Sequence, residues 1–91
     1  MRNYRLVLIL KRGLDKKAVD TLLAEVKKLG GEVKKENLKE MGEKKFAYKI
    51  KGEQSGNYIV WEFESEKISP EMDMRLRNND SILRHLLTRT D

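Results

Sequence analysis

Few residues of this chain have the types and spacing that catalysis requires. His85 is the only histidine and there is no cysteine, so neither a histidine–cysteine metal site nor thiol chemistry can be built. A lone histidine among leucines is more typical of a packed strand residue than of a general base. Glu62, Glu64 and Glu66 could transfer protons or bind Mg²⁺, but a solvated strand face is the better interpretation. We expect no enzymatic activity, no cofactor and no metal.

The cationic side chains indicate a function more clearly than the histidine and the carboxylates do. The chain carries 20 Lys and Arg against 15 Asp and Glu, and this excess favours an acidic partner, either nucleic acid or an anionic membrane surface. Arginines gather near the two ends of the chain: Arg2, Arg5 and Arg12 near the start, and Arg75, Arg77, Arg84 and Arg89 near the end. Guanidinium groups suit phosphate oxygens, and Tyr4 could stack on a base. The ordinary alternative is a solvated surface.

Residues 41–63 predict a β-hairpin around which the other elements are arranged. Residues 44–51 and 57–64 alternate apolar and polar side chains, and a polar break at 52–56 separates them, which is typical of two strands joined by a somewhat long loop. The apolar side chains of each arm share one face: Phe46, Tyr48 and Ile50 in the first arm, and Ile59, Trp61 and Phe63 in the second. Lys44 and Lys45 lie at the start of the first arm, where they could contact an acidic polymer.

Four more elements surround the hairpin arms. Residues 4–10 are apolar on both faces, as in a central strand. A helix is expected over residues 15–29, from an aspartate N-cap to a glycine pair. The strand that leads into the hairpin begins near residue 32, is strongly charged and bends at a glycine, which suits a sheet edge. Ser69 is expected to cap a short helix, and residues 82–90 form a last strand.

This order of elements predicts a single domain over residues 1–91 with the α+β, ferredoxin-like βαββαβ fold. In this fold a four-stranded antiparallel sheet carries two helices on one face, and its first and third strands are central. The other face would expose apolar residues, and such a face usually contacts a partner: Val7, Ile9, Tyr58, Val60 and Leu86. The longest apolar run, residues 6–10, is too short to span a membrane, and no signal segment is visible. We expect a location in the cytoplasm or an equivalent compartment.

Several parts of the chain resemble the bacterial ribosomal protein S6 family, in matching order and spacing. Residues 1–4 (MRNY) resemble the family's opening Met-Arg-x-Tyr, and residues 41–50 (MGEKKFAYKI) are similar to its Leu-Gly-x-Arg/Lys-x-Leu-Ala-Tyr-Pro-Ile. Residues 56–58 (GNY) match its Gly-x-Tyr strand, and residues 82–89 (ILRHLLTR) resemble its Val-Leu-Arg-Tyr-Leu-Leu-Val-Arg ending. Together they extend over essentially the whole chain.

The resemblance implies a structural constituent of the small ribosomal subunit that binds the central domain of 16S-type rRNA jointly with ribosomal protein S18. It also implies a monomer outside the ribosome, located on cytoplasmic or organellar ribosomes, with no membrane contact and no small-molecule substrate. By similarity, the residues that would contact RNA are Arg2, Tyr4, Lys44, Lys45, Arg77, Arg84 and Arg89. Those that would contact the protein partner are Phe46, Tyr48, Ile50, Tyr58 and Val60.

Two positions of the resembling segments depart from the family pattern. Arg5 stands where the family usually has a glutamate, which reverses a charge on the first strand. Lys49 stands where the family usually has a proline, so that strand regains an N–H donor and can pair differently.

Two other functions are compatible with the same topology. An acylphosphatase-like hydrolase would need an arginine-bearing phosphate loop after the first strand, and Arg12-Gly13 is too short to form one. A ligand-sensing or dimerising module without RNA binding would use the helix-free face for self-association. A stable homodimer in sedimentation would favour this module, whereas a monomer would favour the ribosomal role.

Overall fold

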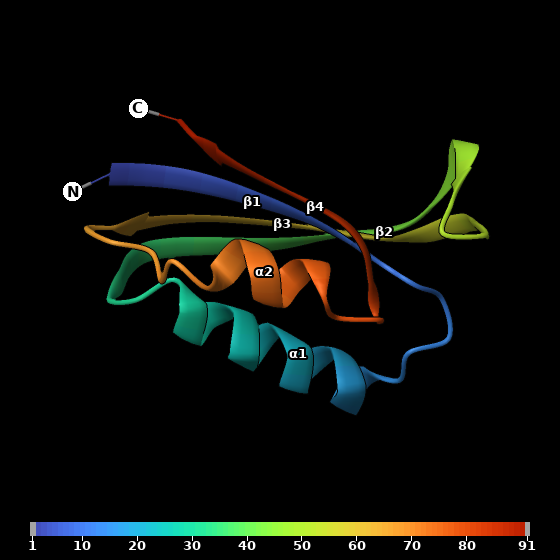
Figure 1. Cartoon of the computed structure of the whole chain (residues 1–91), viewed down its shortest axis with the longest axis horizontal. Coiled ribbons are helices and arrows are strands. Elements are labelled where there is room, and N and C mark those ends of the chain that lie inside the picture. The colour runs from blue at the N-terminus through green and yellow to red at the C-terminus, as the bar shows by residue number, and fades with distance from the viewer. Residues whose placement is uncertain (1, 91) are drawn as a thin grey trace.

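Four strands and two helices follow one another in the computed structural model, which describes residues 2–90. The strands are β1 (Arg2–Leu10), β2 (Val33–Ile50), β3 (Glu53–Ser65) and β4 (Ile82–Arg89), and the helices are α1 (Lys16–Leu29) and α2 (Met72–Arg77). The sheet is antiparallel with the strand order β2-β3-β1-β4, and both helices cover one of its faces (Figure 1). The predicted ferredoxin-like fold is confirmed, with its first and third strands central. The predicted domain ends, residues 1 and 91, lie outside the described part.

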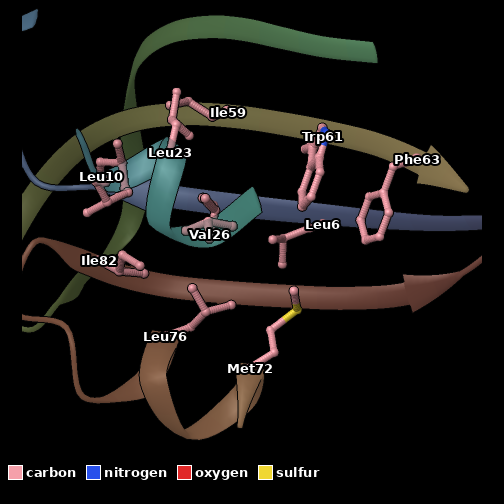
Figure 2. Packing of buried hydrophobic residues seen from close by; sticks show 12 residues of the cluster. Leu6, Leu10, Leu23, Val26, Ile59, Trp61, Phe63, Met72, Leu76 and Ile82 are labelled. Atoms are coloured by element: carbon pink, nitrogen blue, oxygen red, sulfur yellow. The ribbon is translucent and has the colours of Figure 1, made fainter. Parts of the chain in front are cut away.

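The core lies between the sheet and the helices because the central strands direct alternate apolar side chains to that side. Leu6, Leu8 and Leu10 of β1 are fully buried, and both helices place apolar side chains against them (Figure 2). On β3, Trp61 and Phe63 are buried and stack with their ring centroids 3.9 Å apart. Each such side chain contributes about 1.5–3 kcal/mol through burial. This burial fixes the strand register on which the surface residues depend.

Both ends of α1 are determined by local sequence. The Asp15 carboxylate accepts a hydrogen bond from the Ala18 N–H at 2.7 Å, so the expected N-cap is confirmed. After the helix, Gly31 adopts a φ of +77°, and a Cβ at this position would clash with the carbonyl oxygen of Lys67. Only glycine fits there, and the glycine pair ends the helix as predicted.

β2 is a long edge strand whose pairing with β3 is interrupted three times. The register shifts after Lys34, after Glu40 and after Lys45. Most of the strand is exposed and charged, which discourages pairing with a further strand. Gly42 has a φ of +83° at the middle interruption. The prediction of one irregular edge strand, bent near Gly42, is confirmed.

The turn between β2 and β3 is much tighter than the loop expected over residues 52–56. Lys51 and Gly52 form the turn, with φ of +49° and +82°, and two consecutive residues of positive φ are typical of a two-residue type I′ turn. β3 starts directly after it. Gly56 belongs to the strand, where a Cβ would lie 2.6 Å from the Leu10 carbonyl oxygen. The loop prediction is wrong because this glycine allows two strands to approach each other and does not form a turn.

α2 starts later than the predicted N-cap at Ser69. The Ser69 hydroxyl accepts a hydrogen bond from the Glu71 N–H at 3.3 Å, and the Ser69 carbonyl accepts one from the Met72 N–H at 3.1 Å. Ser69 therefore stabilises a turn that precedes the helix. The N-cap position is occupied by Glu71, whose side chain makes no capping hydrogen bond, so the predicted cap is wrong. At the end of the chain, β4 finishes at Arg89, one residue before the predicted limit.

The helix-free face of the sheet carries apolar residues from three strands, as predicted. The expected exposure of Ile9 is wrong, because this side chain is only 7% exposed and lies with the Phe46 ring beside Gly56. Val7 pairs with Val60 of β3 and with Leu86 of β4, and Ile9 pairs with Tyr58. Residues that pair directly point to the same side of a sheet, so these five side chains form one surface. We call this surface the open face. Its most exposed member is Leu86, at 58% of its full accessible area.

Candidate nucleic-acid interface

Five of the seven residues predicted to contact RNA lie in two groups at opposite ends of the sheet. β1 begins and β4 finishes at one end, where Arg2 opens the strand and Tyr4 pairs with Arg89. The β2–β3 hairpin, which carries Lys44 and Lys45, projects from the other end (Figure 1). The described chain extends 37 Å along its longest axis. The two groups would therefore contact different parts of a partner.

Tyr4 is packed against the core and is not a free stacking surface. Its ring centroid lies 5.5 Å from that of Phe63, with an interplanar angle of 27°, and the side chain is half-buried on the helix side of the sheet. Because one face of the ring already contacts Phe63, less of it remains for a base. Arg2 is exposed and forms no ion pair within residues 2–90. Arg2 is therefore the better RNA-binding candidate at this end.

Lys44 and Lys45 project from opposite faces of β2. Lys44 pairs with Gly56, and its Nζ lies 5.7 Å from the centroid of the Tyr58 ring, which is a cation–π distance. Lys45 pairs with Ser55. Both are exposed, and neither forms an ion pair in the described part of the chain. Their charges are available to phosphate groups at this end.

Arg77 is engaged in contacts within the chain. It forms an ion pair with Asp73 one turn earlier on α2, and Asp73 Oδ1 also lies 2.8 Å from His85 Nε2 on β4. The hydrogen bond with His85 and then that with Arg77 lower the pKa of Asp73 below its usual value. His85 thus connects the sheet to α2, which supports its interpretation as a packed strand residue. Arg77 is a weaker candidate for phosphate binding than a free arginine.

Arg84 lies on the open face. It pairs with Ile9, is exposed, and lines a shallow hollow of about 180 Å³ together with Val7 and Leu86. Arginine beside apolar side chains is enriched at protein–protein interfaces, and its guanidinium also suits phosphate. The position of Arg84 is therefore compatible with either kind of partner.

The residues predicted to contact a protein partner do not form one surface. Tyr58 and Val60 lie on the open face and are half-buried between neighbouring strands. The other three belong to the β2–β3 hairpin: Phe46, Tyr48 and Ile50. The Phe46 ring contacts the Tyr58 ring at a centroid distance of 6.1 Å, so it connects the two groups. Tyr48 is 84% exposed, and within residues 2–90 its ring contacts no aromatic ring of the open face.

The hairpin end, defined here as residues 44–54, holds two residues that the sequence did not single out as contacts. Lys49 and Gln54 line a hollow of about 270 Å³ with Lys45 and Tyr48. Simple strand alternation places Lys49 on the face opposite Tyr48, and the expected loop contained Gln54. No signal in the sequence brings these side chains together. The register shift after Lys45 brings Lys49 and Gln54 into the same hollow as Lys45 and Tyr48.

Two of the three acidic residues of β3 form ion pairs with neighbouring strands. Glu62 lies 3.2 Å from Arg5 and Glu64 lies 3.6 Å from Lys35, measured between carboxylate oxygen and side-chain nitrogen. Arg5, a departure from the family pattern, is thus paired across β1 and β3. Within residues 2–90, no three acidic, histidine or cysteine side chains are placed to hold a metal ion. No helix of this part is long and apolar enough to cross a membrane.

An open antiparallel sheet backed by two helices, with cations at both of its ends, defines a ferredoxin-like fold equipped for binding. Comparison with known families identifies the chain further. The model of the family described as ribosomal protein S6 matches residues 3–89. The chain belongs to the ribosomal protein S6 family, and the family resemblance seen in the sequence is confirmed.

Individual relatives are similar over their full length. The small ribosomal subunit protein bS6 of Corynebacterium aurimucosum is 40% identical over 96 aligned residues, which cover 100% of this chain and 98% of that protein. The protein of the same name from Carboxydothermus hydrogenoformans is 32% identical with the same coverage. The crystal structure of 30S ribosomal protein S6 from Thermotoga maritima superimposes with a TM-score of 0.82 at 25% identity, covering 98% of this chain and 87% of that one.

Proposed function

We propose that this chain is a non-catalytic structural constituent of the small ribosomal subunit in the cytoplasm, and that it binds 16S-type rRNA together with ribosomal protein S18. Its family and the names of its relatives support this role. The observation that carries the proposal is the combination of two features: an apolar sheet face that no helix covers, and exposed cations at both ends of the sheet. Arg2, Lys44 and Lys45 form no ion pair within residues 2–90.

RNA binding would depend on these cations. Each phosphate neutralised by an exposed lysine or arginine releases counterions, so the affinity falls as the salt concentration rises. Lys44, Lys45 and Arg2 are the strongest contacts that we propose, followed by Arg84. Arg77 would contribute less because Asp73 already neutralises it. Tyr4 would position the strand through Phe63 and offer only its free side to RNA.

Protein binding would use the open face. Val7, Val60 and Leu86 lie in register across three neighbouring strands, and covering them would remove apolar surface from water. The Arg5–Glu62 ion pair borders this surface, so the partner must leave it solvated or supply matching charges. Outside the ribosome the chain would be a monomer.

A matched pair of double variants tests the RNA contact. In Lys44→Ala with Lys45→Ala, two exposed cations of the hairpin are removed, whereas Lys16→Ala with Lys17→Ala removes two exposed cations at the start of α1. We expect the hairpin variant to bind a central-domain rRNA fragment about tenfold more weakly, with S18 present, and to lose about 1.5 units of salt slope. The helix variant should bind like the unmodified chain. Equal affinities for all three proteins would contradict the proposal.

The alternative function is a dimerising module without RNA binding. It is favoured by a single observation, the exposure of Leu86 on an apolar sheet face, since two copies could cover each other there. Sedimentation of the purified chain separates the two functions. A stable homodimer would support the module, and a monomer would support the ribosomal role.

A further inference from the structure

The hairpin end has more residues on one strand than on the other. Lys45 pairs with Ser55 and Ile50 pairs with Glu53. Residues 46–49 of β2 therefore lie opposite Gln54 alone. The additional residues cannot remain in the ladder, and they bulge away from β3. This bulge frames the hollow of about 270 Å³ whose lining includes Lys45, Lys49 and Gln54.

The two aromatic rings that line the hollow have different roles. The Phe46 ring is half-buried, lies 6.1 Å from the Tyr58 ring, and has its Cζ beside Gly56. It anchors the bulge to the sheet. The Tyr48 ring is 84% exposed, and within residues 2–90 it contacts no other ring. An exposed tyrosine on an anchored bulge is a platform with a free face.

The charge of the hairpin end indicates which kind of partner the exposed Tyr48 ring would bind. Residues 44–52 contain four lysines and no acidic residue. Lys51 donates a hydrogen bond to the Ile82 carbonyl oxygen at 3.3 Å, which holds the hairpin end against β4. Lys45 and Lys49 line the hollow and form no ion pair in the described part of the chain. An anionic partner would find two uncompensated ammonium groups beside an aromatic face.

We propose that the hairpin end binds one unpaired RNA nucleotide, with its base on the Tyr48 ring, its phosphate near Lys45 and Lys49, and its base edge within reach of the Gln54 amide. The inference rests on the proposed RNA-binding function and assigns one contact within it. Unpaired bases stack on aromatic side chains, and their edges accept and donate hydrogen bonds, as an amide side chain also does. A base inside a duplex has no free face to offer.

A protein partner fits this hollow less well. The buried centres of protein–protein interfaces are depleted in lysine, and covering Lys45 and Lys49 with an apolar surface would bury charges without partners. The open face suits a protein partner better, because apolar side chains from three strands lie in register on it. Tyr48, which family resemblance assigned to a protein contact, is thus reassigned to RNA.

The test measures the affinity of three variants for a central-domain rRNA fragment, with and without S18. Tyr48→Ala removes the stacking ring, Tyr48→Phe retains it, and Leu86→Ala is the control for an exposed apolar side chain far from the hairpin end. We expect Tyr48→Ala to lower the RNA affinity about tenfold, because one base stacked on an aromatic ring contributes that much or more. Tyr48→Phe and Leu86→Ala should stay within about twofold when S18 is absent.

Ultraviolet crosslinking of the wild-type chain to the same fragment gives a second measurement. The crosslink should map to residues 45–49 and to a nucleotide that is unpaired in the fragment. The inference is overturned, with the proposed function intact, if wild type and Tyr48→Ala bind the fragment equally. It is also overturned if Tyr48→Ala weakens only S18 binding, which would assign the hairpin end to the protein partner. If the wild-type chain fails to bind the fragment, both the proposed function and this inference are refuted.

Discussion

A Cβ added to Gly56 of β3 would lie 2.6 Å from the carbonyl oxygen of Leu10 in β1. The two strands therefore approach each other more closely here than any other residue type would allow. Ile9 and Phe46 enclose the same point, each with a side-chain atom 3.0 Å from that Cβ position. Because Phe46 also anchors the bulge of β2, this close approach determines where the hairpin end lies relative to the open face.

Substitution of Gly56 by alanine is expected to destabilise the fold. The added methyl group meets backbone at Leu10, which cannot move aside without disturbing the central strand, and overpacking of this kind costs about 1–3 kcal/mol. Urea unfolding followed by Trp61 fluorescence measures the loss as a lower midpoint with an unchanged slope. Gln54→Ala, at an exposed position of the same strand, should change the midpoint little. A Gly56→Ala chain as stable as the wild type would show that β1 and β3 are not in contact as described.

Acid is expected to weaken the connection between α2 and β4. The pKa of Asp73 is lowered by His85 and Arg77, so its contribution to stability is fully present above its unfolded-state pKa, about 3.9. That contribution is lost as the pH falls through the lower folded-state pKa. Asp73→Asn should remove this part of the pH dependence, whereas Asp20→Asn, on the exposed side of α1, should retain it. The measurement is the urea midpoint between about pH 5 and about pH 2. Identical pH profiles for the two variants would contradict the assigned contacts.

The open face is expected to bind the protein partner. Leu86→Asp places a charge at the most exposed residue of the open face and should weaken S18 binding about tenfold or more, since a buried unpaired charge is costly. Met74→Asp is the matched control, because Met74 is 51% exposed and lies on α2, on the other side of the sheet. Isothermal titration with purified S18 measures both. If both variants lost the same S18 affinity, or if only Met74→Asp lost affinity, the partner would be placed on the helical side of the sheet.

The arrangement of the fold follows from sequence because it depends on periodicity. Leu6, Leu8 and Leu10 alternate with Val7 and Ile9, and this pattern of apolar side chains on both faces predicts a central strand. The Asp15 cap and the glycine pair after α1 are local signals of the same kind. Such features need no knowledge of distant residues, which is why they are confirmed.

The hairpin end could not be predicted in the same way. The two glycines that flank residues 53–55 have different structural roles: Gly52 supplies the positive φ of the turn, whereas Gly56 allows the approach of Leu10. Sequence shows only two glycines and a polar stretch between them. The register shift after Lys45, which brings Tyr48 and Gln54 to one hollow, depends on both.

Two of the predicted RNA contacts, Tyr4 and Arg77, are engaged by other residues of the chain. Tyr4 contacts Phe63, which is distant in the sequence, and Arg77 is held by an Asp73 that also contacts His85. The contact of Tyr4 with Phe63 has no local sequence signal, whereas Asp73 lies four residues before Arg77, a spacing from which an ion pair on one helix face can be predicted. Arg2, Lys44 and Lys45, in contrast, are exposed and form no ion pair within residues 2–90.

The most direct test of the central proposal is whether a tagged copy of the chain co-purifies with small ribosomal subunits and stays bound through a wash at moderate salt. We predict that it does, and that the copy with Lys44→Ala and Lys45→Ala is released at a lower salt concentration than the copy with Lys16→Ala and Lys17→Ala. Recovery of the wild-type chain away from small subunits, as a free monomer or a homodimer, would contradict the ribosomal role.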